Sequence, residues 1–462
     1  MPISGPGSNI SAGLRTNCMK TILIKNARIV NQGSVNFGDL FIKNGRIDRI
    51  GSGLNDLATD IIIDVDGNVA MPGMIDAHVH LRQPGMTHKG DITSESRAAV
   101  AGGITSYLEM PNTVPPTTTI DRLEEKYRIA ARTSLANYAF YLGVTYSNLD
   151  EIRRLDPQRV AGVKMFMGAS TGNMLVEEPK TIHRIFAEAP ILLAVHCEDP
   201  SIIKKNEAIF RSRFGENVPM KHHPDIRSTE ACYQSTALAV ELAHRYGTRL
   251  HVLHLSTQDE LSLFSDRPLS EKSITAETCA HYLFFDAGDY TKKGTFIKCN
   301  PAIKSWQDRE ALICAVKANR IDTIATDHAP HTLIEKKISY FHAPSGLPLA
   351  QHALVSLLEL YHRGIFSLEM IAEKTAHAPA RIFQIEQRGF IREGYWADLV
   401  LVDLDRPWVV SDGNIRSKCG WSPFDGYRFC SSIIATIVSG HPVWHAGKID
   451  DSVKGRRLRF DR

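Results

Sequence analysis

Eight short apolar runs between residues 71 and 385 constrain the fold of this chain more than any other feature. Each run has the length of a strand, and the stretches between them carry apolar residues at helical spacing. Repeated strand–helix units are typical of an α/β fold with a parallel sheet, and eight of them predict a (β/α)8 TIM-type barrel with insertions. The runs are MIDAHVH, GITSYLEM, ANYAFYLGV, VAGVKMFMG, ILLAVHC, RLHVLHLS, SITAETC and IDTIATD.

The segments before and after this barrel in the sequence have a different hydrophobic pattern. Residues 19–70 and residues 386–462 contain strand-like runs separated by turn signals such as KNG and DG, without helical patterns between them. Neither segment is long enough to build its own core, so we expect both to form one small β-sandwich domain beside the barrel. Residues 1–18 are rich in Gly, Ser and Asn, and we predict a disordered N-terminal extension there.

Composition excludes several classes of function. Charged residues make up 23% of the chain and hydrophobic residues 43%, which is ordinary for a globular protein. The net charge of +3 provides no basic field for nucleic acid, and no apolar run approaches the ~18 residues that span a membrane. The eight cysteines have no regular spacing, and we interpret them as reduced. These features predict a cytoplasmic enzyme that binds neither nucleic acid nor membrane.

Residues of metal-ligand type recur at the ends of the predicted strands. His78 and His80 lie two residues apart, so a strand would point both imidazoles to the same side. Such a pair is weak evidence alone, but His196, His254 and Asp327 each end another predicted strand. A barrel gathers the carboxyl ends of its strands at one face, where catalytic groups lie. The five residues together predict a metal site at that face.

Lys164 is the unusual residue of the strand-like run VAGVKMFMG, because an ammonium between apolar neighbours is costly to bury. Either the lysine is neutral or reaches the surface, or it is carbamylated and its new carboxylate bridges two cations. The sequence leaves both interpretations open. Residues 168–174, which follow, lack the Gly-Lys-Ser/Thr ending of a phosphate-binding loop. We predict a mobile barrel loop over the active site there.

Several motifs together resemble those of the dihydroorotases, in the cyclic amidase group of the amidohydrolase superfamily, over nearly the whole chain. They are DAHVHLRQPG, MPNT, VHCED, HVLHLST, CNPAIKSWQDREAL, ATDHAPH and REGYWADLVLVDL. The resemblance implies a zinc-dependent hydrolase of carbon–nitrogen bonds in cyclic amides. Its implied reaction is the reversible cyclisation of N-carbamoyl-L-aspartate to (S)-dihydroorotate with release of water, the third step of de novo pyrimidine (UMP) synthesis.

The same resemblance implies two zinc ions per subunit, bridged by carbamylated Lys164 and a hydroxide. Asp327 would accept the proton of that hydroxide as general base and pass it to the departing ring nitrogen as general acid. The implied metal ligands are His78, His80, Lys164, His196, His254 and Asp327.

Residues that would bind substrate follow from the same motifs. Dihydroorotate carries a carboxylate on its ring, and Arg82 and Asn112 can supply the cation and the amide donor that it needs. Ser345 and Gly346 would add main-chain contacts. The implied substrate-binding residues are His80, Arg82, Asn112, Asn300, His331, Ser345 and Gly346. We expect a small-molecule substrate and a homodimer or larger homo-oligomer.

Two departures from the dihydroorotase pattern keep alternatives open. The run VKMFMG resembles the lysine strand of hydantoinases and allantoinases, whereas many monofunctional bacterial dihydroorotases have aspartate in this role. Lys304 stands where the family pattern usually shows arginine. One alternative is therefore a dihydropyrimidinase, hydantoinase or allantoinase, which Arg82 and Asn112 oppose. A non-catalytic amidohydrolase-like scaffold is a second alternative, disfavoured because every candidate ligand is in place.

Overall fold

The computed structural model describes residues 20–168 and 174–462 of the chain. The predicted extension over residues 1–18 lies outside these ranges, as do residues 169–173 of the predicted active-site loop. In the described part of the chain, no helix is long and apolar enough to cross a membrane. The seven cysteines found there are free thiols.

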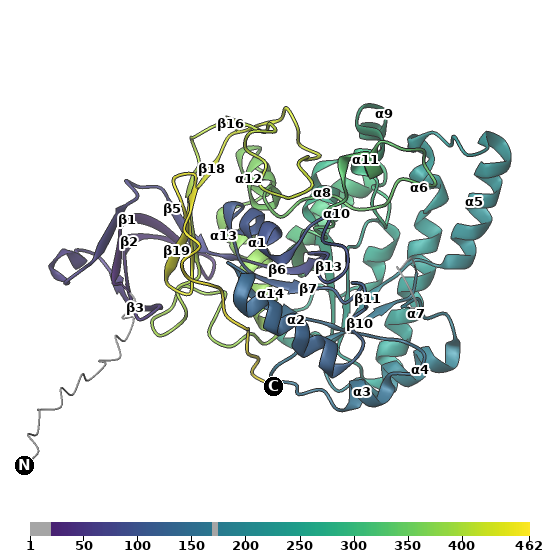
Figure 1. Ribbon diagram of the computed structural model, residues 1–462, viewed down its shortest axis with the longest axis horizontal. Coiled ribbons are helices and arrows are strands. Elements are labelled where there is room, and N and C mark those ends of the chain that lie inside the picture. Colours follow the sequence, from purple (N-terminus) through teal and green to yellow (C-terminus); the bar gives the residue numbers. More distant parts are fainter. Residues whose placement is uncertain (1–19, 169–173) are drawn as a thin grey trace, which may run out of the picture.

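A ring of parallel strands forms the centre of the molecule (Figure 1). The hydrogen-bonding order is β6-β7-β8 in one run and β9-β10-β11-β12-β13-β14 in the other, with β8 and β9 forming two halves of one strand around Tyr141. A parallel bridge between Val79 and His328 closes the ring. The expected eight-stranded barrel is thereby confirmed. Its strands are β6 (Met74–Val79), β7 (Ile104–Glu109), β8 (Asn137–Phe140), β9 (Leu142–Gly143), β10 (Val163–Phe166), β11 (Leu193–His196), β12 (Leu250–Val252), β13 (Ile274–Cys279) and β14 (Thr323–Ala325).

Helices surround this ring and pack their apolar faces on it (Figure 1). Their first turns are well capped: Asp91 before α1 and Ser305 before α10 each accept a main-chain N–H and complete a capping box. The helices are α1 (Ile92–Ala101), α2 (Ile120–Thr133), α3 (Leu149–Arg153), α4 (Pro179–Glu188), α5 (Pro200–Phe214), α6 (His223–Ile226), α7 (Thr229–Tyr246), α8 (Ala280–Phe284), α9 (Tyr290–Lys293), α10 (Trp306–Lys317), α11 (Leu333–Lys336), α12 (Ala353–His362), α13 (Leu368–Ala372) and α14 (Ala378–Ile382). Shorter helical turns are Leu54–Asp56, Met220–His222, Asp259–Leu263, Leu269–Glu271, Ala287–Asp289, Gly294–Ile297 and Glu373–His377.

Strands from both terminal segments form one sheet beside the barrel, as the sequence predicts (Figure 1). Its order is β20-β19-β18-β15-β5-β1-β2-β3, and β4 pairs with β1 off this path. The strands hydrogen-bond into one continuous sheet, and residues of β1, β2 and β3 share a hydrophobic core with residues of β15 and β18. They are β1 (Ile22–Asn31), β2 (Ser34–Lys43), β3 (Arg46–Gly51), β4 (Ile61–Asp64), β5 (Val69–Pro72), β15 (Leu399–Asp403), β18 (Ser432–Val438), β19 (His441–His445) and β20 (Lys448–Ile449), with a separate pair β16 (Trp408–Val409) and β17 (Arg428–Phe429).

The period of two along these strands separates two hydrophobic clusters. On β15, Val400 and Val402 belong to the main cluster that the barrel shares, whereas Leu399 and Leu401 belong to the core of the small domain. Along β5, β15 and β18, the sheet therefore buries one face on the barrel and the other in the core of the small domain. Residues 455–462 leave the sheet and run beside the barrel, where Arg457 bridges to Tyr138 of β8.

Candidate active site

A cavity of about 280 Å³ opens at the carboxyl ends of the barrel strands. The structure brings every predicted metal-binding and substrate-binding residue to this one cavity, although the residues come from eight separate stretches of the chain. Phe166, Ala329 and Pro344 complete the wall. The predicted residues that line it are His78, His80, Arg82, Asn112, Lys164, His196, His254, Asn300, Asp327, His331, Ser345 and Gly346.

Strand alternation explains how Lys164 and the first histidines reach the cavity. On β10, Val163 and Met165 pack in the main hydrophobic cluster, so Lys164 between them points into the barrel. On β6, Val79 packs outward in the same way, and His78 and His80 both line the cavity. The shared orientation that the sequence predicts for the two histidines is thus present.

His78 and His80 converge on one carboxylate oxygen. Their Nε2 atoms lie 3.2 and 3.0 Å from Oδ1 of Asp327. The Nδ1–H of His78 donates to Glu277 at 2.9 Å, and the Nδ1–H of His80 donates to Asn112 at 2.7 Å. Burial lowers the pKa of His80 to about 4, so its Nε2 carries a lone pair. Electron-rich atoms from three side chains therefore face one another, which is the donor set of a divalent cation.

His196 and His254 form a second convergent pair. The Nε2–H of His196 donates to Glu198 at 2.9 Å, so its Nδ1 carries a lone pair toward Nε2 of His254, 2.8 Å away. Lys164 is fully buried, and its Nζ has no hydrogen-bond partner among the described residues. Burial lowers the pKa of Lys164 to about 7, so a large fraction of the amine is neutral near pH 7. His196, His254 and Lys164 therefore form a second cluster of nitrogen donors at the cavity.

The carboxylates behind the histidines are the functional residues that sequence reasoning missed. Glu277 contacts His78, and Glu198 contacts His196 while Arg227 forms an ion pair with Glu198. Such outer partners fix the tautomer and orientation of a metal-binding imidazole. A sequence signal was available for Glu198, which follows His196 by two residues in VHCED. None was available for Glu277, because its contact depends on a strand far away in sequence.

We expect Glu277→Gln to weaken metal binding ~10- to 100-fold, because the amide no longer holds His78 in one tautomer. Metal dissociation measured by competition with a chelator tests this directly and needs no activity assay. Glu260→Gln is the matched control, since Glu260 is an equally buried carboxylate whose partners are the hydroxyls of Thr236 and Thr257. Equal metal affinity in the Glu277 variant and the wild type would contradict the orienting role.

Three residues of the site adopt the left-handed backbone conformation that non-glycine residues rarely take. The φ angles are +69° at Arg82, +43° at His254 and +50° at Asp327. Each residue lies just after the end of its strand, where the chain turns and the side chain enters the cavity. Backbone strain of this kind costs ~1–3 kcal/mol per residue and concentrates at functional sites.

The substrate side of the cavity is electropositive. Arg82 is only 5% exposed; its Nε–H donates to the carbonyl of Pro330 at 3.0 Å, and its Nη2 lies 3.0 Å from Nε2 of His331. Burial, reinforced by Arg82 and Lys89, holds the pKa of His331 well below its usual value, so the imidazole is neutral. Next to His331, the hydroxyl of Ser345 donates to Oδ1 of Asn300 at 2.9 Å.

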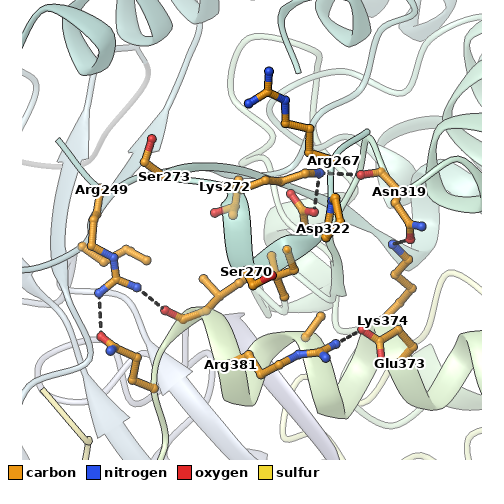
Figure 2. A pocket seen from close by; sticks show the side chains of 17 residues that line it. Arg249, Arg267, Ser270, Lys272, Ser273, Asn319, Asp322, Glu373, Lys374 and Arg381 are labelled. Atoms are coloured by element: carbon orange, nitrogen blue, oxygen red, sulfur yellow. Dashed lines mark hydrogen bonds and ion pairs between the residues drawn. The ribbon is translucent and has the colours of Figure 1, made fainter. Parts of the chain in front are cut away.

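A larger cavity of about 700 Å³ lies away from these residues, near the start of β12 and β13 (Figure 2). Most of its charged groups already have protein partners: Lys272 pairs with Asp322 at 2.7 Å, Lys374 donates to the carbonyl of Ile321 at 2.7 Å, and Arg381 pairs with Glu373. Interactions at the amino-terminal end of barrel strands usually serve stability. We therefore interpret this cavity as a structural junction, and the smaller cavity as the active site.

Comparisons with known proteins agree with the interpretation of the smaller cavity as an active site. The amidohydrolase family pattern matches residues 69–443. A dihydroorotase of Halobacterium salinarum is 35% identical over 428 residues, which cover 91% of this chain and 96% of that protein. An allantoinase of Bacillus velezensis is 30% identical over 432 residues, covering 92% and 94%. The solved L-hydantoinase from Arthrobacter aurescens has a TM-score of 0.90 at 28% identity, covering 96% of this chain and all of that one.

Proposed function

Because the chain belongs to the amidohydrolase family, we propose that it is a zinc-dependent dihydroorotase of pyrimidine synthesis. The enzyme class, a hydrolase acting on cyclic amides, follows from the family and from the dihydroorotase-like sequence. The proposed reaction is the reversible closure of N-carbamoyl-L-aspartate to dihydroorotate with release of water. A biosynthetic step of this kind places the enzyme in the cytoplasm.

The choice of dihydroorotate as substrate rests on the burial of Arg82 without an ionic partner. Its guanidinium is buried in the cavity, and no carboxylate of the described residues lies within 4.0 Å of it. Burying a cation without an ionic partner is costly unless a ligand supplies the opposite charge. Dihydroorotate brings a carboxylate on its ring, whereas a neutral cyclic amide leaves the cation unpaired.

Metal ions would provide Lewis acidity toward water and the ring amide carbonyl. The residues that would hold two zinc ions are His78, His80, Lys164 as its carbamate, His196, His254 and Asp327. Asp327 would accept the proton of the attacking water and deliver it to the ring nitrogen as that bond breaks. Arg82 would bind the ring carboxylate, with Asn112, Asn300 and His331 orienting the ring. In the closing direction, Asp327 would take the proton from the ureido nitrogen and return it to the hydroxyl group that leaves as water.

A hydantoinase or allantoinase is the second candidate. It is favoured by the close structural match to the L-hydantoinase and by the similarity to the allantoinase. Turnover of dihydroorotate, dihydrouracil, hydantoin and allantoin by the metal-loaded enzyme tests the two proposals against each other. We expect dihydroorotate to have the highest kcat/KM, and a preference for any neutral ring would overturn the dihydroorotase assignment.

Removing the charge of Arg82 should affect the acidic substrate selectively. Arg82→Met keeps much of the stem and deletes the guanidinium, and we expect a loss of ~2–5 kcal/mol of transition-state binding for dihydroorotate. A neutral ring such as dihydrouracil should lose far less. The values of kcat/KM for both substrates in the wild type and the variant measure this difference.

Lys89→Met is the matched control for this substitution. Lys89 also contacts His331, at 3.0 Å, but its ammonium is paired with Glu335 at 2.8 Å. We expect a small and equal effect of the control on both substrates. Equal losses for both substrates in Arg82→Met would show that Arg82 supports the site and does not select charge.

A further inference from the structure

Two buried lysines lie beside the substrate wall of the cavity, and the reaction proposed above uses neither. Lys336 is fully buried and Lys298 is 7% exposed. Neither ammonium has a carboxylate within 4.0 Å among the described residues. Burying an ammonium without an ionic partner costs free energy. The partners of both lysines are main-chain carbonyl groups.

Lys336 directs all three of its N–H groups at carbonyl oxygens. Its Nζ donates to Pro344 at 2.9 Å, to Gly346 at 3.0 Å and to Lys298 at 3.2 Å. Lys298 in turn donates through Nζ to the carbonyl of Ala343 at 2.6 Å. The two lysines therefore bind three carbonyls of segment 343–346, which forms one wall of the cavity.

These contacts determine which way one peptide group faces. The carbonyl of Pro344 and the N–H of Ser345 belong to the same planar trans unit, so they point in opposite directions. Because Lys336 holds that carbonyl on its own side, the N–H of Ser345 faces away from Lys336. Ser345 lines the cavity and Lys336 does not. Among the described residues, this N–H has no acceptor.

The neighbouring groups of the segment are already occupied. The N–H of Gly346 donates to the carbonyl of Lys298 at 2.9 Å, and the carbonyl of Ser345 lies 3.0 Å from Nε2 of His331. The amide of Ser345 is therefore the donor that the segment can offer to a ligand. Rotation of this peptide plane would replace that donor by a carbonyl and repel an anionic or carbonyl oxygen.

We propose that Lys336 is a positioning residue, supported by Lys298, that fixes the Pro344–Ser345 peptide so that the Ser345 N–H binds an oxygen of the substrate. The oxygen belongs to a ring carbonyl or a carboxylate. Burial lowers the pKa of Lys336 to about 7 and that of Lys298 to about 8, so burying these two lysines costs free energy that their carbonyl contacts only partly offset. The inference rests on the proposed function only for the choice of substrate.

Lys336→Met tests the proposal, with Lys374→Met as matched control. Lys374 is also a buried lysine that binds a main-chain carbonyl, that of Ile321, but it lies at the structural junction (Figure 2). In Lys336→Met we expect amide exchange in segment 340–347 to rise ~10- to 100-fold, because charge-assisted hydrogen bonds are lost. The KM for dihydroorotate should rise by a similar factor, with kcat and metal content nearly unchanged. The control should change neither the exchange of this segment nor KM.

The two readouts separate failure of this inference from failure of the proposed function. Unchanged exchange in segment 340–347 of a folded Lys336→Met protein, or an equal rise in the control, would overturn the positioning role. If the wild type turns over another cyclic amide, the dihydroorotase proposal fails, and KM is measured with that substrate. If Lys336→Met does not fold, Lys298→Met, which loses the contact with Ala343, must show the same rise in exchange and KM for the proposal to stand.

Discussion

Replacing Asp327 by Asn should lower kcat ~10²- to 10⁴-fold while the fold and most of the bound metal remain. The amide has nearly the shape of the carboxylate and can still coordinate, but it cannot accept the proton of the attacking water. Burial alone would raise the pKa of Asp327, but His78 and His80 outweigh it and hold the pKa well below its usual value. The carboxylate is therefore ionised, which is the form that can accept a proton.

A substitution at the opposite end of the same strand separates an effect on catalysis from an effect on stability. Asp322 lies just before β14 at the opposite end from Asp327, and it pairs with Lys272. We expect Asp322→Asn to lower the melting temperature and to leave kcat close to that of the wild type. Single-turnover kinetics, metal content and thermal unfolding of both variants make the comparison. Near-normal turnover in Asp327→Asn would refute the role of Asp327 as general base and acid.

Much of the site could be predicted from sequence, because two general rules of strand and barrel geometry determine where its residues lie. The alternation of side chains along a strand brings His78 and His80 to one side, and a barrel gathers the ends of its strands. These two rules bring His196, His254 and Asp327 to the cavity as well, where all five are found. Their roles stay predictions until metal and turnover are measured.

Contacts between distant segments could not be predicted in this way. Glu277 is one residue in a buried strand, and only the order of strands around the barrel shows that it reaches His78. Nothing in the sequence around Lys336 indicates that its side chain is fully buried against segment 343–346. The single continuous sheet of the small domain also depends on long-range pairing, such as Val400 with Met71.

The small domain and the active site are more closely linked than the sequence suggests. Trp421 lies in the segment assigned to the β domain, but its indole N–H donates to the carbonyl of His331 at 2.7 Å. Nearby, the hydroxyl of Ser417 donates to Glu95, which also binds the ring of His328 beside Asp327. The carboxyl-terminal segment therefore supports loop 328–331, which follows Asp327 and lines the cavity. The expected homo-oligomer stays a prediction.

Lys164→Ala should remove at least one metal ion and most of the activity. The amine of Lys164 has no protein partner among the described residues, is fully buried, and lines the same cavity as His196 and His254. A carbamate formed by its neutral amine and carbon dioxide would supply the acidic oxygen ligands that the two histidines lack. Without that group, the donors on this side of the cavity are two neutral imidazoles, which bind a divalent ion weakly.

Chemical rescue distinguishes a carbamate from a structural lysine. The space left in Lys164→Ala can admit a short-chain carboxylic acid, whose carboxylate takes the place of the carbamate, so added acetate or propionate should restore part of the metal content and activity. Lys126→Ala is the control, because Lys126 is an equally buried lysine that already has a carboxylate partner, Glu109 at 2.6 Å. Added carboxylic acids should not restore any metal content or activity that Lys126→Ala loses. Full metal occupancy and activity in Lys164→Ala would show that this lysine is structural and that another residue completes the metal site.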